Sequence, residues 1–438
     1  MFGFLTSVVL ILKSLVMEKE LRIREGMLMM GLRGRTYWLS WFVTHYSTLV
    51  IVATLMALIG TYPFQHSAAI IMWLFYLSWT ASLVLFCYAL STLFSTSKIA
   101  AVAGSLLYIL TWAPAVSVTS GSGALGNPGW TAVCFFPASG IYMWGVAVAL
   151  LENAELGVTW ETLFMNLISS RDGAGSGNFS AGLVIVVTLV SAVCSALMAA
   201  YLDRVWPKQF GTTLPLWFPL SAAWWRHGHC GAVASGQGGQ GATEDEEACA
   251  LVQGGCEPAP EGGAAPALAL RSLSKSFTTP TGALTAVDNL TLSFYPGHIS
   301  ALLGHNGAGK TTTLGMLCGL LPASGGSACV DGLDVATQMH AIRRRLGVCP
   351  QHDILWPTLS CEEHLVLYSA FRGVPRDRAG AQAAAMLAEV GLKDKADAAA
   401  GTLSGGQRRK LSLAIAFVGG PRGATAGRCE LDRSHSLD

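Results

Sequence analysis

Charged residues are scarce in this chain of 438 residues. Asp, Glu, Lys and Arg together make up 13% of it, whereas roughly 25% is usual in a soluble domain. They are thinnest between residues 36 and 203, where apolar runs close to membrane-spanning length recur. The formal net charge is only +1, so the composition gives no support to a nucleic-acid partner. It predicts instead that the first half is embedded in a membrane.

Paired cysteines are missing as well. Eleven cysteines are scattered along the chain, and no Cys-x-x-Cys pair occurs among them, which argues against a zinc ribbon or a thiol redox motif. His227, His229 and Cys230 lie close together at the start of a Gly/Ala-rich stretch. We interpret them as incidental residues of a flexible segment rather than as metal ligands.

The second half does contain a phosphate-binding loop. Residues 304–311 fit the pattern G-x-x-x-x-G-K-[ST] without a mismatch. The apolar run 299–303 before the loop predicts a buried strand, and the composition of 312–321 predicts a helix after it. Backbone N–H groups at the start of such a helix surround the phosphates of a nucleotide. The residues expected to contact it are Gly304, His305, Asn306, Gly307, Ala308, Gly309, Lys310, Thr311 and Thr312.

Lys310 and Thr311 carry the chemistry of this loop. The lysine would reach the β- and γ-phosphates, and the threonine hydroxyl would ligate Mg²⁺. The sequence therefore predicts a site for ATP with Mg²⁺, on the cytosolic side of a membrane.

Four segments are long and apolar enough to span that membrane: 37–60, 68–94, 99–118 and 181–201. Residues 1–16 are shorter, and we interpret them as the end of a further span. Lys and Arg residues place 17–35, the turn at 95–98 and the end of the last segment on the cytoplasmic side. The apolar stripe of 17–35 predicts an amphipathic cytoplasmic helix.

Residues 132–151 are also apolar, but Pro137, Gly140 and Gly145 interrupt them. If they crossed the membrane fully, the phosphate-binding loop would lie outside the cell, where ATP is not available. We therefore predict a re-entrant hairpin on the outer side.

The chain accordingly divides into four predicted parts. Residues 1–220 form a transmembrane domain of about five spans plus the hairpin near 132–151. Residues 221–266 form a flexible Gly/Ala-rich linker. A nucleotide-binding domain occupies 267–420, with strands predicted at 268–273 and 290–294, and an unrelated tail occupies 421–438.

A second glycine-rich motif, Leu-Ser-Gly-Gly-Gln at 403–407, opens a predicted helix at 408–418 and forms another anion-binding arrangement. Between the two motifs, Gln351 ends a predicted strand at 346–350. With these motifs the chain resembles the ATP-binding-cassette transporters. The resemblance extends to subfamily A, the lipid exporters, in the first half of such a protein. It is carried by the stretches 18–32, 91–95, 208–219, 304–313, 346–365 and 403–420.

The resemblance implies further site residues. Gln351 would touch Mg²⁺, and Phe277 would stack on adenine, although a core phenylalanine is the alternative for that position. Each active site of this family is composite, so a second nucleotide-binding domain and membrane half are implied as partners, besides membrane lipids. The residues expected to act on ATP held by that second domain are Ser404, Gly405, Gly406 and Gln407.

One expected motif is missing. The family continues past the second motif into a strand that ends in Asp-Glu, the Walker B pair, but 421–438 contains no Asp-Glu dipeptide and no apolar run. No catalytic residue is therefore assigned, and we expect a fragment: a multi-pass α-helical membrane domain followed by an incomplete α/β P-loop NTPase domain. The function predicted from the resemblance is ATP-driven lipid transport. The alternatives are a membrane-anchored ATP-binding polypeptide without hydrolysis and an exporter of non-lipid hydrophobic compounds.

Overall fold

The computed structural model describes residues 2–120, 131–167, 179–206, 217, 265–279, 282–420 and 423–426. It consists of two compact units. The first comprises Met1–Arg24 and Arg33–Trp206, and the second comprises Glu25–Leu32 and Pro207–Asp438. The predicted linker 221–266, apart from 265 and 266, and the predicted tail 421–438, apart from 423–426, lie outside the described residues.

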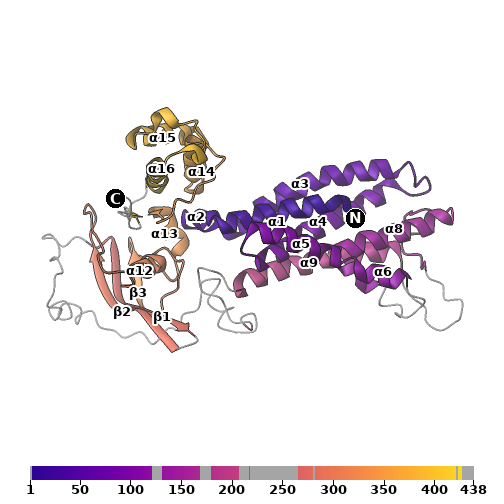
Figure 1. Cartoon of the computed structure of the whole chain (residues 1–438), viewed down its shortest axis with the longest axis horizontal. Helices are drawn as coiled ribbons and strands as arrows, with labels where there is room; N and C mark the ends of the chain where they lie inside the picture. Colours follow the sequence, from indigo (N-terminus) through magenta and orange to yellow (C-terminus); the bar gives the residue numbers. More distant parts are fainter. Residues whose placement is uncertain are drawn as a thin grey trace, which may run out of the picture. The chain divides into compact units, whose positions relative to one another are not determined.

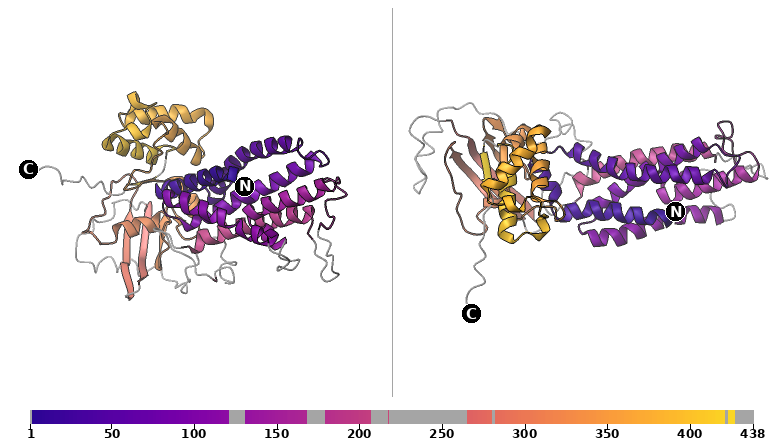
Figure 2. Two further views of the ribbon diagram at one scale, coloured as in Figure 1. Left: turned by 45° about the vertical axis from the view of Figure 1, so that its right-hand side comes forward. Right: turned by 90° about the horizontal axis from the view of Figure 1, so that it is seen from above.

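The first unit is helical, and its longer helices run side by side (Figures 1 and 2). Its elements are η1 (Phe2–Phe4), α1 (Leu5–Glu20), the start of α2 (Ile23–Met29), α3 (Gly34–Gly60), α4 (Ala69–Leu93), α5 (Ser97–Leu110), α6 (Ala113–Ser120), η2 (Val133–Phe135), α8 (Pro137–Asn153) and α9 (Ala181–Val205).

Four helical stretches among the described residues are long and apolar enough to cross a membrane: α3, α4, Ser97–Thr119 and α9. They coincide with the four segments predicted from the sequence, although the third bends into α5 and α6. Helix α1 has 16 residues. The stretch 132–151 forms η2 and most of α8, and its re-entrant course stays a prediction.

The predicted amphipathic helix over 17–35 is wrong in its continuity. Helix α1 continues to Glu20, α2 begins at Ile23, and between them Arg22 adopts a left-handed φ of 57°. Such a φ is strained for a residue with a side chain and ends the helix. Residues 17–35 are therefore divided among the end of α1, α2 and the start of α3 rather than forming one helix.

Helix α4 is the centre of the first unit, where it packs against α1, α3 and α9. Its Phe75 stacks on Trp144 of α8 with ring centroids 4.1 Å apart, and its Ser82 shares a hydrogen bond of 3.2 Å with Ser191 of α9. In lipid, helices associate through such packing and interhelical hydrogen bonds rather than through the hydrophobic effect.

The second unit combines two sheets with helices. The antiparallel sheet has the order β2-β1-β3-β4, and β5 and β6 form a parallel pair. Its strands are β1 (Leu268–Thr279), β2 (Gly282–Phe294), β3 (Gly325–Val330), β4 (Leu333–Asp334), β5 (Leu346–Cys349) and β6 (Gly423–Ala426). Its helices are α12 (Lys310–Leu317), α13 (Met339–Arg345), α14 (Cys361–Phe371), α15 (Arg376–Glu389) and α16 (Gly405–Phe417), with short turns η4 (Lys393–Lys395) and η5 (Ala400–Thr402).

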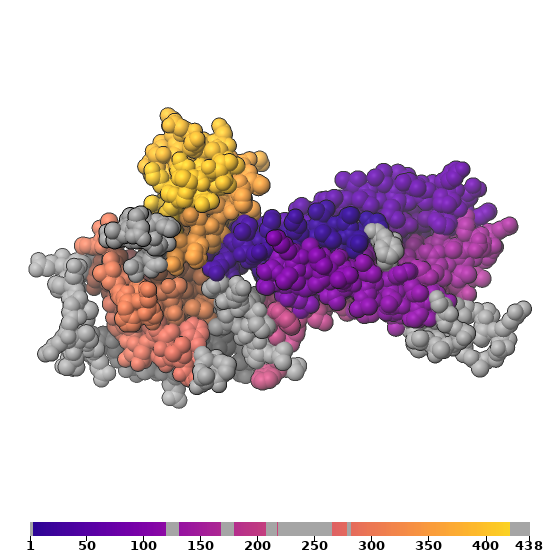
Figure 3. Space-filling model, in the orientation of Figure 1, coloured from indigo at the N-terminus to yellow at the C-terminus, as the bar shows by residue number. Residues whose placement is uncertain are grey.

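Three hydrophobic cores occur among the described residues of this unit. One lies between α12 and the antiparallel sheet, around Leu270 and Leu317. The second joins α13 to β3 and β5 around Ile342, and the third joins α14, α15 and α16 around Leu365 and Leu411. The helices of the third core form a lobe, yellow in the space-filling view, that projects from the rest of the unit (Figure 3).

The predicted buried strand at 299–303 is wrong. These residues form no strand, and Ile299 and Leu303 are 103% and 86% exposed. A strand buried in a parallel sheet needs neighbours to satisfy its N–H and C=O groups. Among the described residues, β5 and β6 pair with each other and no strand pairs with 299–303. The short β6, Gly-Ala-Thr-Ala, was missed because it has no apolar run.

Candidate nucleotide-binding site

The phosphate-binding loop is shaped by two glycines with left-handed backbone. Gly307 has φ 88° and Gly309 has φ 82°. A Cβ at Gly309 would lie 2.4 Å from the carbonyl oxygen of Ala286 in β2, so only glycine fits there. The amide of Ala308 donates to the carbonyl of His305 at 3.1 Å and closes the turn. Strand β2 therefore supports the loop directly.

Lys310 folds over this loop. Its ammonium donates to the carbonyls of Gly304 and His305 at 2.5 and 2.8 Å. Thr311 follows on the first turn of α12 and is exposed. Residues 304–308 are exposed as well, so the loop is accessible to a nucleotide.

The donor set around the loop fits Mg²⁺ bound together with a nucleotide. No group of three His, Cys, Asp or Glu residues that could hold a metal occurs in the part of the chain that the structure describes. Mg²⁺ typically keeps several waters and takes one or two protein ligands besides phosphate oxygens. The exposed hydroxyl of Thr311 can be such a ligand, and ATP would supply the phosphates.

Phe277 lies near the end of the hairpin that β1 and β2 form. It pairs with Leu284, while Lys275 pairs with Val287 beside the loop-supporting Ala286. The Phe277 ring is half-buried, and the Lys275 ammonium lies 5.2 Å from its centroid. The hairpin thus places an aromatic ring within two residue pairs of the strand segment that touches the phosphate loop.

The loop after β5 is tied to α16. Arg409 donates to the carbonyls of Pro350 and Gln351, the latter at 3.4 Å, and lies 3.8 Å from the Asp353 carboxylate. Ser412, one turn further along α16, donates to the same carboxylate at 3.1 Å. Gln351 itself is exposed. Arg409 and Ser412 thus link α16 to the loop around Gln351.

Helix α16 begins at the second glycine-rich motif with a complete capping box. Gln407 N donates to the Ser404 hydroxyl at 3.3 Å, and Ser404 N donates to the Gln407 amide oxygen at 2.9 Å. Gly405 and Gly406 are exposed, and a Cβ on either would meet nothing within 4 Å. The helix N-terminus is therefore open to an anionic ligand from outside the unit.

Residues 25–32, which we name the docked segment, fold as part of the nucleotide-binding unit. Met29 is 6% exposed and belongs to the core around α13, β3 and β5, whereas Met30 is 3% exposed and belongs to the core of α14, α15 and α16. A Cβ on Gly26 would lie 3.1 Å from Ile354, in the loop after Gln351. Two consecutive methionines thus enter two different cores.

A small pocket adjoins the docked segment. Its lining combines that segment with β5, the Gln351 loop, α14 and α16: Gly26, Met29, Met30, Val348, Pro350, Ile354, Tyr368, Ser412 and Ile415. This arrangement could not be predicted from the sequence, because the methionines at 27, 29 and 30 fit the stripe of a surface helix equally well.

Arg372, at the end of α14, is buried beside the docked segment. It donates to the Ala416 carbonyl at 2.9 Å, at the C-terminal turn of α16, and to the Met30 sulfur at 3.4 Å. Its Nε and a second terminal nitrogen are buried without a partner among the described residues, and burial lowers the pKa of Arg372 to about 10. A cation near helix-terminal carbonyls is favourable, so Arg372 links α14, α16 and the docked segment.

The structure brings the Gln351 loop, α16 and the docked segment together in one place. Helix α12, which follows the phosphate-binding loop, packs instead against the antiparallel sheet in a different core of the same unit.

Comparison with known proteins identifies the fold class. Residues 287–423 match the family described as "ABC transporter", and residues 1–201 match the family described as "ABC-2 family transporter protein". Together with the four apolar helices of the first unit, these matches show a membrane domain followed by an ATP-binding-cassette ATPase domain. The chain belongs to the ATP-binding-cassette transporters.

Within that family the chain is homologous to subfamily A. It is 36% identical over 425 residues to ATP-binding cassette sub-family A member 7 of Rattus norvegicus, and the aligned region covers 96% of this chain and 19% of the relative. It is 35% identical over 422 residues to Phospholipid-transporting ATPase ABCA7 of Homo sapiens, with coverage of 95% and 19%. It is 33% identical over 426 residues to Retinal-specific phospholipid-transporting ATPase ABCA4 of Homo sapiens, with coverage of 95% and 18%. The chain thus spans about a fifth of the length of these relatives.

Proposed function

We propose that this chain is part of an ATP-driven transporter of phospholipid or sterol, with its nucleotide-binding domain in the cytosol. Two of the relatives are named phospholipid-transporting ATPases, and the similarity covers both the membrane part and the ATPase part of the chain. The basic residues of 17–35 support the cytosolic side.

The observation that carries the proposal is the placement of Met29 and Met30. The docked segment is continuous in sequence with α1 and α3, yet its methionines are packed into the cores of the nucleotide-binding unit. Core packing is close to that of a crystal and transmits displacement. A change in α16 or in the Gln351 loop therefore moves a segment that leads directly into apolar helices.

In the proposed site, the amides of 304–311 and the Lys310 ammonium bind the phosphates of ATP. The Thr311 hydroxyl, with Gln351, holds Mg²⁺, which neutralises phosphate charge when bound. The Phe277 ring stacks on adenine. The supports are the accessible loop of exposed residues and the position of Phe277 near β2.

The second motif acts on a second nucleotide. The Ser404 hydroxyl and the amides of Gly405 and Gly406 would bind ATP that another nucleotide-binding domain holds. That domain belongs either to the same gene product or to another subunit. The exposed N-terminus of α16 supports this arrangement. Closure of the two domains around ATP, and their reopening, would drive the membrane helices.

A second function is favoured by β6. This strand runs parallel to β5 directly after α16, and its sequence Gly-Ala-Thr-Ala contains no carboxylate. The strand therefore offers no carboxylate to hold Mg²⁺ or to polarise an attacking water. We therefore propose that the chain by itself binds Mg·ATP without turning it over, and that turnover requires residues outside this sequence.

The experiment uses the purified chain in lipid nanodiscs that contain a photoactivatable phospholipid. Mg·ATP should bind, change the photolabelling of the membrane unit, and remain unhydrolysed. The Lys310→Ala variant should lose binding and the labelling change, whereas Lys393→Ala, at an exposed turn of the same unit, should behave as the unsubstituted chain.

Three results would count against the proposal. Photolabelling of the membrane unit that is the same with and without bound ATP would contradict coupling between ATP binding and the membrane helices. A response to a photoactivatable non-lipid drug, but not to phospholipid, would favour an exporter of non-lipid compounds. Robust turnover that Lys310→Ala abolishes would contradict the absence of a catalytic acid.

A further inference from the structure

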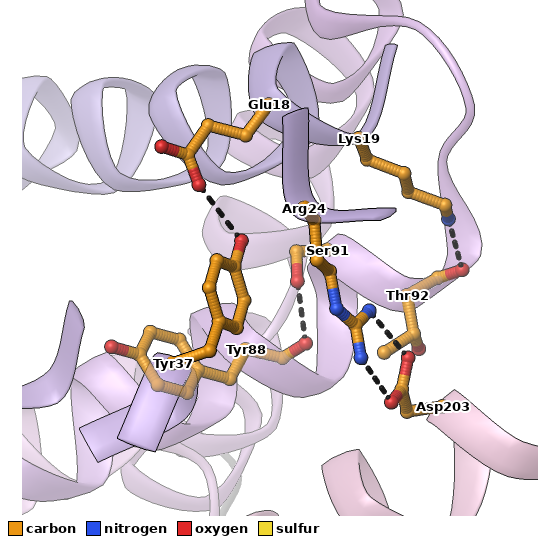
Figure 4. A network of polar contacts seen from close by, with 8 residues as sticks. All are labelled: Glu18, Lys19, Arg24, Tyr37, Tyr88, Ser91, Thr92 and Asp203. Atoms are coloured by element: carbon orange, nitrogen blue, oxygen red, sulfur yellow. Dashed lines mark hydrogen bonds and ion pairs between the residues drawn. The ribbon is translucent and has the colours of Figure 1, made fainter. Parts of the chain in front are cut away.

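A cluster of polar side chains surrounds the junction between α1 and α2 in the membrane unit (Figure 4). Glu18, only 8% exposed, accepts hydrogen bonds from the Tyr37 hydroxyl at 3.0 Å and the Trp41 indole at 2.9 Å. Both partners belong to α3. A buried carboxylate held by two donors fixes the relative position of the helices that supply them.

The next two residues hold the ends of two other helices. The Lys19 ammonium donates to the carbonyls of Thr92 and Phe94 at 3.1 and 2.8 Å, at the C-terminus of α4. The Glu20 carboxylate accepts the amide of Ser97 at 2.9 Å, at the N-terminus of α5. A cation at a helix C-terminus and an anion at an N-terminus both complement the helix dipole. The junction therefore anchors α4 and α5 as well.

Arg24 makes the remaining connection, to α9. Its guanidinium forms a bidentate ion pair with Asp203 at 2.6 and 2.8 Å, and lies 5.0 Å from the Trp38 ring centroid and 5.3 Å from that of Tyr37. The two charged side chains are 18% and 17% exposed. Bidentate geometry, partial burial and two aromatic faces make such a pair strong and directional.

The position of Arg24 in the chain gives this pair its significance. Arg24 is the last residue of the membrane unit before the docked segment, which begins with Glu25 in the same helix α2. Because the helix is interrupted at Arg22, α2 does not continue along the axis of α1. The Arg24–Asp203 pair restrains the start of α2 relative to α9 through side chains.

We propose that the Arg24–Asp203 ion pair is a latch that fixes α2 to α9 and carries displacement of the docked segment into the membrane helices. Arg24 and Asp203 are thus positioning residues, which act through the helices that they join. The inference rests on the proposed function, since it requires that ATP binding moves the docked segment.

The test measures the distance between spin labels at Val43 in α3 and Val193 in α9, both exposed, with and without Mg·ATP. The labels are non-natural amino acids, because the chain has eleven cysteines. The variants are Arg24→Gln, Asp203→Asn and the exchange Arg24→Asp with Asp203→Arg. Arg35→Gln, at an exposed site on α3, is the matched control, and ATP affinity is measured on every sample.

The single variants should bind ATP as the unsubstituted chain does but lose the ATP-dependent distance change. The exchange variant should regain it, which a merely structural loss would not allow. Should the single variants fail to fold, Arg24→Lys provides a second test, because lysine keeps the charge but cannot donate two parallel hydrogen bonds to Asp203. This variant should fold and show a smaller ATP-dependent distance change.

The outcomes separate the two proposals. A distance change that persists in the single variants, or that is lost equally in the exchange variant, overturns the latch alone. An unsubstituted chain that binds ATP without any distance change contradicts the proposed function, and the latch with it.

Discussion

Removing the Met30 side chain should loosen α16. Met30 is 3% exposed in the core that α14, α15 and α16 share, and truncation of a buried methionine to alanine costs roughly 2–5 kcal/mol. A loss of about 3 kcal/mol corresponds to roughly 100-fold faster opening, since each 1.4 kcal/mol is about a factor of ten. Met30→Ala should therefore accelerate hydrogen exchange of the buried amides between 411 and 418 by about that factor.

Hydrogen-exchange mass spectrometry resolves this effect by peptide. Met17→Ala is the matched control, because Met17 is 42% exposed and its truncation should cost no more than about 0.5 kcal/mol. If Met30→Ala leaves exchange between 411 and 418 unchanged, the docked segment does not pack into this core, and the reasoning is refuted.

Three further predictions concern the nucleotide-binding unit. Burial lowers the pKa of His364, so the folded protein keeps this imidazole neutral, and the free energy of unfolding should fall as pH drops below the unfolded pKa of about 6.5. Urea titrations between pH 5 and 8 should show that the free energy of unfolding changes less with pH in His364→Gln. An equal change with pH in both proteins would contradict this. Gly309→Ala should abolish ATP binding in a fluorescent-nucleotide assay, because φ is 82° and the new Cβ would overlap Ala286, whereas Gly380→Ala, in open space on α15, should not. Ser404→Ala should cost roughly 0.5–2 kcal/mol by removing the cap of α16 and leave ATP binding at 304–311 intact; unchanged exchange in the first turn of α16 would argue against the cap.

Motifs with a local cause could be predicted from the sequence. The loop at 304–311 and the motif at 403–407 are recognisable because glycines and a capping serine act within a few residues of their own position. Long apolar segments such as 37–60 were equally predictable, because length and composition alone decide whether a helix can span a membrane.

Features that depend on distant partners could not be predicted. The run 299–303 is as apolar as a buried strand, but a strand forms only where neighbours pair with it, and none of the described strands does. The two cores entered by Met29 and Met30 are built from residues more than two hundred positions away. Arg409 is one charged residue among many on a helix, and its hold on the Gln351 loop depends on tertiary structure.

The most direct test of the central claim is hydrogen exchange in lipid nanodiscs with and without Mg·ATP, followed in α12, in residues 25–32 and in α3. The claim is that the effect of nucleotide binding at 304–311 is transmitted to the membrane helices through the docked segment. In the unsubstituted chain, Mg·ATP should change hydrogen exchange in all three regions. In Met30→Ala, it should change exchange in α12 but not in α3. A response of α3 to ATP that survives Met30→Ala, with ATP binding intact, would contradict the claim.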